Sequence, residues 1–197
     1  MNLRPALVIA SLMLAVSLAG NVWAGTPADQ IRLQIDRVVQ VLADPDLKTV
    51  GRERDRQAAV RRIAEEVFDL GEMTRRTLGP HWQRRTEAER AEVVTLFGDL
   101  LERTYFTRIA GYSGEKITVL GDSTDGDRAT VRTRIVTQQG TEIPVDYRML
   151  RRGDRWMIYD VSIEGVSLVA NYRAQFDKII QTSSYQALVD KLRSKRG

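Results

Sequence analysis

The sequence predicts an α+β domain in which a twisted four-stranded antiparallel sheet is flanked by N-terminal and C-terminal helices. Apolar residues recur at helical spacing up to about residue 110 and again after residue 167, whereas between them apolar and polar residues alternate. The turns between the alternating stretches are too short for crossover connections, so neighbouring strands have to be antiparallel. Helices, then a sheet, then helices is an order typical of α+β domains.

The predicted helices begin and end at recognisable signals. Residues 26–29 (TPAD) are typical of an N-cap followed by proline in the first turn, and the Asp-Pro pair at 44–45 ends that helix. A charged segment from Arg52 leads into a second helix, and residues 71–78 predict a short one that stops at the following Gly-Pro pair. Residues 86–89 (TEAE) form a capping box, which predicts a long helix of about 22 residues.

The alternating stretches predict strands at 116–120, 129–138, 142–150 and 155–163. One face of this sheet collects mostly apolar side chains, which are Val131, Thr133, Ile135, Ile143, Val145, Tyr147, Met149, Trp156 and Ile158. The other face carries Arg132, Arg134, Asp146 and Arg148, together with Tyr159 and Val161. After the sheet, Ser167 is a candidate cap for one helix, and Ser183 or Ser184 for a last one.

Residues 1–24 are typical of a cleavable secretory signal peptide. Arg4 supplies a positive charge, residues 6–19 form an apolar stretch, and residues 22–24 (VWA) match the positions that a signal peptidase reads. We therefore expect a single mature domain at 25–197. The alternative is an uncleaved membrane anchor, which the pattern favours less because the apolar stretch is shorter than the ~20 residues that cross a bilayer.

The composition excludes several classes of site and partner. The chain has no cysteine, which excludes disulfides, thiolate chemistry and a lipidated cysteine and fits an exported bacterial protein of the periplasm. Thirty basic residues against 26 acidic ones leave a net charge of +4, which is too balanced to indicate a nucleic-acid partner. Basic residues cluster at 52–62, 75–85 and 191–196, where they are either solvated helix faces or points of transient contact with an anionic membrane surface.

Catalytic and metal-binding motifs are scarce. His81 is the only histidine and lies in a predicted surface loop, so neither a multi-histidine metal site nor a Ser-His-Asp triad is indicated. The aspartates within 122–127 lack the ligand spacing of a calcium loop and fit a hairpin tip. Asp146 or Asp160 could act as a general base in a sheet-lined cavity, but a buried aspartate that accepts hydrogen bonds explains them better. We expect no catalytic residue, no metal and no cofactor.

The C-terminal half carries motifs of a known family. Residues 156–168 (WMIYDVSIEGVSL) and 171–176 (NYRAQF), with FD at 68–69, LGPHW at 78–82 and FGDLL at 97–101, resemble the toluene-tolerance family. This family is the periplasmic phospholipid-binding carrier of the Mla (maintenance of lipid asymmetry) system. The resemblance extends over the whole mature chain, and its motif residues here are Trp156, Tyr159, Asp160, Val161, Gly165, Val166, Asn171, Tyr172, Arg173 and Phe176.

The resemblance implies both a fold and a set of partners. The fold is a twisted sheet related to the NTF2-like cone, with flanking helices that enclose a deep apolar lipid cavity. The partners are a phospholipid ligand, an inner-membrane ABC transporter with an MCE-domain ring, and an outer-membrane lipoprotein–porin complex, served by a monomeric carrier. Some relatives belong to hopanoid lipid pathways instead, so a hopanoid ligand stays open.

Eleven bulky or apolar residues are the expected lipid-lining residues: Phe97, Leu101, Tyr105, Tyr147, Met149, Trp156, Ile158, Val166, Val169, Tyr172 and Phe176. Their spacing fits an ordinary packed core equally well. Two acyl chains exposed to water cost on the order of 20 kcal/mol at ~0.8 kcal/mol per methylene, so a carrier has to bury the tails. A charged phosphate gains little from burial, which predicts few strong headgroup ligands.

Two further interpretations belong to other functional classes. The first is an NTF2-like enzyme that acts on a hydrophobic small molecule, with Asp160 or Asp146 as its base; fold alone does not supply such an activity. The second is an envelope adaptor protein with a filled core. The lipid carrier is favoured over both because export, the scarcity of catalytic groups and the resemblance all agree with it.

Overall fold

The computed structural model describes residues 25–194, without the side chains of residues 107 and 108. The predicted signal peptide at 1–24 lies outside the described residues, so its cleavage stays a prediction. The elements in chain order are α1 (Pro27–Ala43), α2 (Pro45–Lys48), α3 (Glu53–Val67), α4 (Leu70–Leu78), the 3₁₀ helix η1 (Gly79–Arg84), α5 (Glu87–Ala110), β1 (Lys116–Asp125), β2 (Arg128–Val136), β3 (Glu142–Arg152), β4 (Arg155–Ile163), β5 (Val166–Ser167), α6 (Leu168–Thr182) and α7 (Tyr185–Ser194).

The helix boundaries follow the capping signals in the sequence. The Thr26 hydroxyl accepts the Asp29 N–H at 3.1 Å, and the Asp29 carboxylate in turn accepts from Thr26, so α1 begins with a capping box. Thr86 and Glu89 form the same reciprocal pair before α5, which runs for 24 residues. Ser184 rather than Ser183 caps α7, because its side chain accepts the Ala187 N–H.

The sheet has five strands in the order β1-β2-β3-β4-β5, and every neighbouring pair is antiparallel. The sequence predicts four, and the additional β5 has only two residues, too few for alternation to be read. β1 also extends beyond its predicted end at residue 120. The register between β1 and β2 shifts from Val119 to Gly121, and this irregularity breaks the alternation in the sequence while the strand continues.

A second irregularity corrects the predicted face of one residue. The pairing of β3 with β4 shifts between Arg148 and Met149, so that Tyr147 pairs with Val161 and Met149 with Ile158. The extra residue turns Val161 onto the apolar face beside Tyr147, so its predicted place on the polar face is wrong. A bulge adds one residue to a strand, and every side chain beyond it then points to the opposite face.

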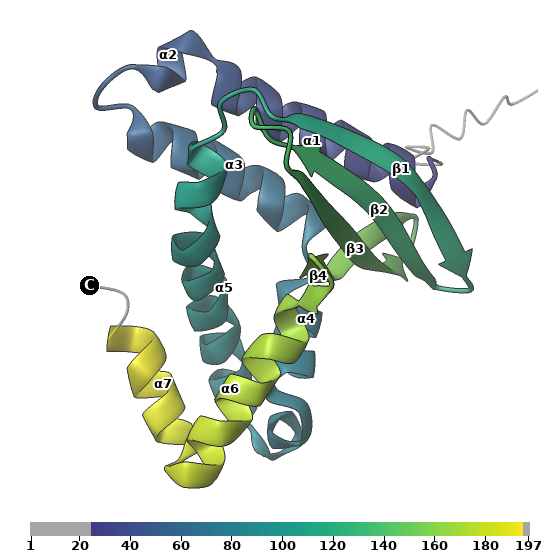
Figure 1. Cartoon of the computed structure of the whole chain (residues 1–197). Coiled ribbons are helices and arrows are strands. Elements are labelled where there is room, and N and C mark those ends of the chain that lie inside the picture. The colour runs from purple at the N-terminus through teal and green to yellow at the C-terminus, as the bar shows by residue number, and fades with distance from the viewer. Residues whose placement is uncertain (1–24, 195–197) are drawn as a thin grey trace, which may run out of the picture.

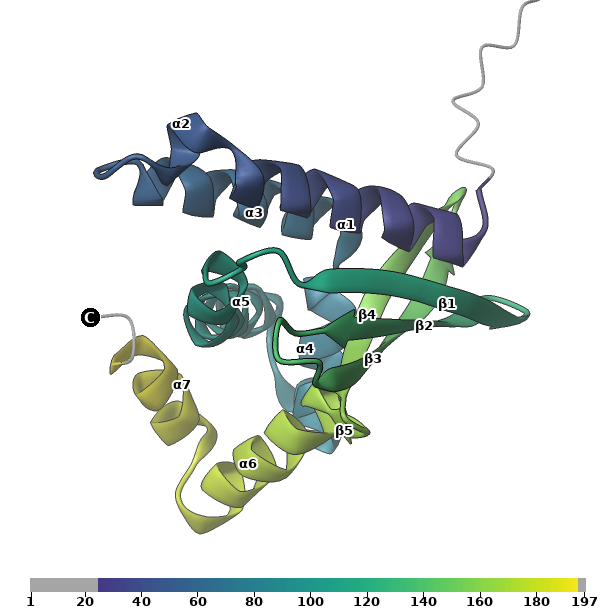
Figure 2. The same ribbon diagram turned by 45° about the horizontal axis from the view of Figure 1, so that its top comes forward.

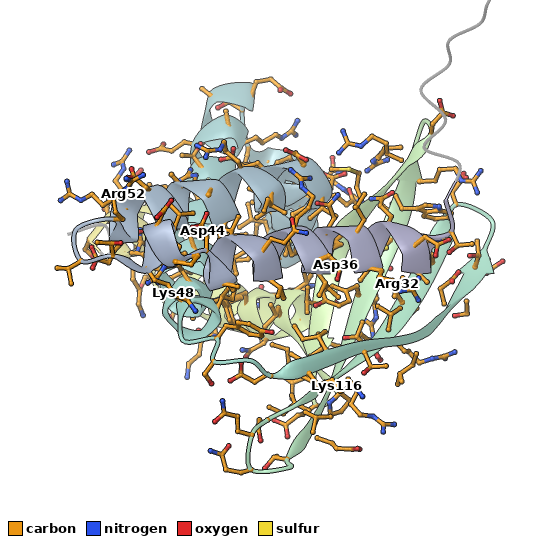
Figure 3. The ribbon with its side chains drawn as sticks, turned by 90° about the horizontal axis from the view of Figure 1, so that it is seen from above. Arg32, Asp36, Asp44, Lys48, Arg52 and Lys116 are labelled. Atoms are coloured by element: carbon orange, nitrogen blue, oxygen red, sulfur yellow. The ribbon has the colours of Figure 1, made fainter. Side chains whose placement is uncertain are left out.

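The helices form a layer over the sheet and a second group beside it. α1 and α3 lie side by side across the sheet and α5 (Figures 1 and 2). The outer side of this layer is charged, with Arg32 and Asp36 on α1 and with Asp44, Lys48 and Arg52 around the turn into α3 (Figure 3). α4 and α6 leave the sheet at its β4 edge and pack along each other, and α7 folds back against α5.

The core consists of two clusters. The helical cluster joins α4, α5, α6 and α7 through Met73, Leu78, Val93, Leu96, Phe97, Leu100, Val169, Tyr172, Phe176, Leu188, Val189 and Leu192. The sheet cluster joins the start of α1 and the end of α3 to the sheet through Ala28, Ile31, Val67, Ala129, Val131, Val145, Met149, Trp156, Ile158 and Val161. Phe68 packs against both, so the two clusters meet at the start of α4.

Candidate functional site

Six of the predicted lipid-lining residues lie in or against the helical cluster: Phe97, Leu101, Tyr105, Val169, Tyr172 and Phe176. Three of them form an aromatic group in which the Phe97 ring meets Tyr172 at 5.2 Å and Phe176 at 5.5 Å between centroids, both edge-on. Such pairs stabilise a folded chain beyond their buried area. Leu101 and Tyr105, farther along α5, are only half-buried.

Four more lie on the sheet: Tyr147, Met149, Trp156 and Ile158. The last three are buried members of the sheet cluster, and Gln30 of α1 bonds both the backbone N–H and the carbonyl of Trp156. Tyr147 packs half-buried against them, and burial raises the pKa of its phenol while a hydrogen bond with Thr133 partly opposes this. The eleventh residue, Val166, lies on β5 with 58% of its surface exposed.

Several apolar side chains of α1, α5 and the sheet are half-buried and pack against the two core clusters. The helices in close backbone contact with strands are α1, α3, α4 and α6, whereas α5 packs on α3, α4 and α7. Figure 2 shows α5 end-on beside the sheet, under the layer of α1 and α3. The seam set is the group of half-buried apolar residues on these elements: Ile35, Leu101, Tyr105, Ile135, Ile143, Tyr147 and Ile163. The lipid-lining role that the sequence predicts for Leu101, Tyr105 and Tyr147 stays a prediction.

Asp160 lies on the opposite face of β4 and is 2% exposed. Its carboxylate accepts from Arg148 at 3.1 Å, from the Ser167 hydroxyl at 2.6 Å and from the Val169 N–H at 3.0 Å. The β4 bulge puts it there, because Asp160 pairs with Arg148 while Val161 turns inward. Asp160 thus joins the sheet to the first turn of α6, where a negative charge also suits the helix dipole.

A pocket of about 420 Å³ opens where α4, the outer face of β3 and β4, and the start of α6 meet. Its lining is basic, and we refer to it as the arginine pocket: Arg75, Arg76, Gly79, Arg148, Tyr159, Asp160, Ser167, Val169, Ala170 and Arg173. Arg76 lies over the Tyr159 ring at 4.0 Å from its centroid. Four arginines therefore share one pocket, which the sequence analysis did not predict.

Glu72 organises the α4 side of the arginine pocket. Its carboxylate binds Arg75 through two hydrogen bonds of 2.7 Å and Arg76 through a third of 2.7 Å. The hydrogen bonds from Arg75 make the largest contribution to lowering the pKa of Glu72, and that from Arg76 lowers it further, whereas burial raises it. The net effect is a pKa below the usual range of a glutamate. The carboxylate is therefore ionised at neutral pH.

His81 is less exposed than the sequence predicts for a histidine in a surface loop. It lies in η1, and its Nε2 is 2.7 Å from an Asp177 carboxylate oxygen on α6. Its side chain is 20% exposed. This contact ties η1 to α6, which is a structural role.

Within residues 25–194, no group of three or more histidine, cysteine, aspartate or glutamate side chains is arranged to hold a metal ion. In the same range, no helix combines the length and the apolar character that a membrane crossing needs.

Comparison with known proteins identifies the family. The sequence model described as "MlaC protein" matches residues 33–194. The chain belongs to the MlaC family. The resemblance to the toluene-tolerance family is thereby confirmed, since a curated relative of this MlaC-family chain is the toluene tolerance protein Ttg2D of Pseudomonas putida, 25% identical over 125 residues.

A second curated relative is the intermembrane phospholipid transport system binding protein MlaC of Haemophilus influenzae, 24% identical over 122 residues. The alignments cover 59% and 62% of this chain and span only 57% and 58% of the Haemophilus and Pseudomonas proteins, respectively. A phospholipid-binding protein from Ralstonia solanacearum, solved in complex with a phospholipid, has the same fold with a TM-score of 0.77. It is 23% identical, and the match covers 86% of this chain and 96% of that one.

The arginine pocket had no signal within a single stretch of sequence. Arg75 and Arg76 lie on α4, Arg148 on β3 and Arg173 on α6, so only the packing of these elements brings them together. A partial signal was present, since the family motif contains Arg173 and the pair at 75–76 belongs to a basic cluster. Interpreting the cluster at 75–85 as a solvated helix face does not predict that its arginines share a pocket with residues of β3 and α6.

Proposed function

We propose that this chain is a periplasmic phospholipid carrier that holds the acyl chains of its ligand between α5 and the apolar face of the sheet. The observation that carries the proposal is the seam set, the half-buried apolar side chains of α1, α5 and three strands that pack against the helical cluster or the sheet cluster. Half-buried apolar side chains on facing elements gain free energy when an apolar ligand covers them, by about 25 cal/mol per Å² removed from water.

The family and the fold support the same assignment. The Haemophilus relative is named as a phospholipid transport binding protein, and the Ralstonia neighbour was solved with a phospholipid. We extend this to a monomer that moves phospholipid between an outer-membrane lipoprotein–porin complex and an inner-membrane ABC transporter with an MCE-domain ring. Such a carrier needs a free mature domain, which agrees with a signal peptide that is cleaved after residue 24.

The positions of the two aspartates argue against the enzyme interpretation. Asp146 pairs with Ser162 and Arg132, and Asp160 pairs with Arg148, so both lie on the face opposite the seam set. A general base has to come within hydrogen-bond reach of the proton it removes. The acyl chains of a ligand that covers the seam set would be out of reach of both carboxylates.

Lipid analysis of the purified mature protein tests the proposal. Organic extraction followed by mass spectrometry should recover glycerophospholipid, and delipidated protein should take phospholipid from liposomes. Ile143→Asp on β3 and Leu101→Gln on α5 each put a polar group into the seam set. We expect at least about fivefold lower loading for each, because an unpaired polar group beside acyl chains costs about 1–3 kcal/mol or more.

Leu120→Gln is the matched control, since Leu120 is 53% exposed at the β1 irregularity and lies outside the seam set. Its loading should equal that of the unaltered protein, and thermal melts of all variants separate lipid loss from unfolding. A purified protein that contains no lipid and takes none from liposomes would contradict the proposal. If a polycyclic lipid is recovered in place of phospholipid, the ligand is of that class, and the seam set is still the proposed site that binds it.

A further inference from the structure

We propose that the arginine pocket is a binding site for a phosphate-class oxyanion, the group that a phospholipid headgroup and free phosphate share. Only the headgroup source rests on the proposed function. The pocket lies on the face of the sheet opposite the seam set, and its volume of about 420 Å³ has ample room for a phosphate with bound water.

The charge of the arginine pocket is unbalanced. Four guanidinium groups line it, and among the described residues the carboxylates hydrogen-bonded to them are those of Asp160 and Glu72. Four positive charges less two negative ones leave a surplus of two. A surplus of this sign over a concave surface attracts an anion of charge one or two.

Arg173 is the cation best placed to supply this surplus. Among the described residues it has no hydrogen-bond or ion-pair partner, so its five N–H donors are available. Its guanidinium lies against Gly79 at the end of α4, where a Cβ atom on residue 79 would be 3.0 Å from its Nε. The C-terminal end of a helix favours a cation. Gly79 thus leaves space for an arginine that is held without a carboxylate partner.

The other cations are already fixed in position by the protein. Glu72 holds Arg75 and Arg76, the Tyr159 ring supports Arg76, and Asp160 holds Arg148. A guanidinium that is oriented before binding loses little side-chain freedom when the anion arrives. Guanidinium groups also match the geometry of phosphate oxygens through paired hydrogen bonds.

The wall of the arginine pocket connects it to the apolar interior. Val169 is a buried member of the helical cluster, and Tyr159 packs against that cluster. An anion in the pocket would therefore lie between the arginines and these two side chains.

The experiment compares the mature protein with two variants in titrations with inorganic phosphate, followed by the backbone NMR shifts of residues 167–170. Arg173→Gln removes the pocket arginine that has no partner among the described residues. Arg62→Gln is the control, because it removes an exposed arginine on α3 that also has no partner among the described residues, and it changes the net charge by the same amount. We expect Arg173→Gln to weaken phosphate binding about tenfold, the loss of one charge-assisted interaction. Arg62→Gln should leave the dissociation constant unchanged.

A second measurement identifies the source of the anion. Each protein is loaded from vesicles that contain either phosphatidylglycerol or diacylglycerol, which lacks the phosphate. If Arg173→Gln lowers loading of phosphatidylglycerol but not of diacylglycerol, the pocket takes the headgroup; if it lowers neither while phosphate binding falls, the pocket takes free phosphate. Absence of phosphate-dependent shifts at 167–170, or equal weakening in Arg62→Gln, would overturn the inference. A protein that binds phosphate but takes neither lipid would contradict the carrier proposal instead.

Discussion

Single residues in this fold act mainly by fixing the position of others. Glu72 is an example, because a buried carboxylate on α4 orients two arginines, and Arg152 of β3 approaches it to 3.8 Å. The side chain of Glu72 is 8% exposed, whereas its arginine partners reach the solvent. A carboxylate that is bonded on several sides keeps its charge in the interior, and its removal leaves several guanidinium groups without their acceptor.

We predict that Glu72→Gln lowers the free energy of unfolding at pH 7 by about 1–3 kcal/mol. The pKa of Glu72 is lowered in the folded state, so its contribution is fully present above the unfolded-state value of about 4.3 and is lost as the pH falls through the lower folded value. Urea unfolding at pH 7 and at pH 3 measures this. The difference between the two proteins should shrink at the acidic pH.

Glu65→Gln provides the control, because Glu65 forms an exposed pair with Arg61 and its side chain is 54% exposed. Exposed pairs of this kind contribute about 0.3–0.5 kcal/mol. An equal effect of the two substitutions, or a difference that does not depend on pH, would contradict the role given to Glu72.

At the scale of elements, α6 depends on the sheet for its first turn. Ser167 caps the helix by accepting the Ala170 N–H, and Asp160 of β4 accepts both the Ser167 hydroxyl and the Val169 N–H. The turn that precedes β5 contains Glu164 with a positive φ of 50°, which is uncommon for a residue other than glycine. Specific hydrogen bonds of Asp160 and Ser167 therefore join β4 to the first turn of α6.

We predict that Asp160→Asn weakens this connection by about 2–3 kcal/mol, because an amide has one acceptor oxygen in place of two. Hydrogen exchange of the Val169 and Ala170 amides should become faster by one to two orders of magnitude, since each 1.4 kcal/mol is tenfold. Asp146→Asn is the control, a half-buried position on the same face of the sheet. Unchanged exchange at the start of α6 in Asp160→Asn would show that α6 is anchored elsewhere.

On the scale of the whole molecule, the core is divided into the helical cluster and the sheet cluster, and the residues of the seam set are half-buried at the margins of the two. The aromatic group lies within the helical cluster, and α1 contributes Ala28 and Ile31 to the sheet cluster. α1 makes close backbone contacts with β1 and β2, whereas α5 packs mainly on other helices. Under the proposed function, we expect both clusters to stay buried when a lipid leaves the seam set.

We predict that phospholipid raises the melting temperature of delipidated protein. A ligand at a hundred times its dissociation constant stabilises the folded state by about 2.7 kcal/mol, or roughly 5–10 °C for a domain of this size. Calorimetry with and without phosphatidylglycerol vesicles measures the shift. Ile143→Asp should reduce the shift, whereas Leu120→Gln should retain it in full; a shift of equal size in Ile143→Asp would place the lipid outside the seam set.

The sequence alone determined the order of helices and strands, the N-cap at Thr26, the capping box at Thr86, and membership of the family, because periodicity, caps and a contiguous motif are properties of short stretches of chain. Only the tertiary structure decided the β4 bulge, which moved Val161 inward and aimed Asp160 at Arg148 and α6. It also assembled the arginine pocket from Arg75, Arg76, Arg148 and Arg173, and it left the seam set half-buried. Both depend on packing between elements far apart in the chain, which no local pattern reports.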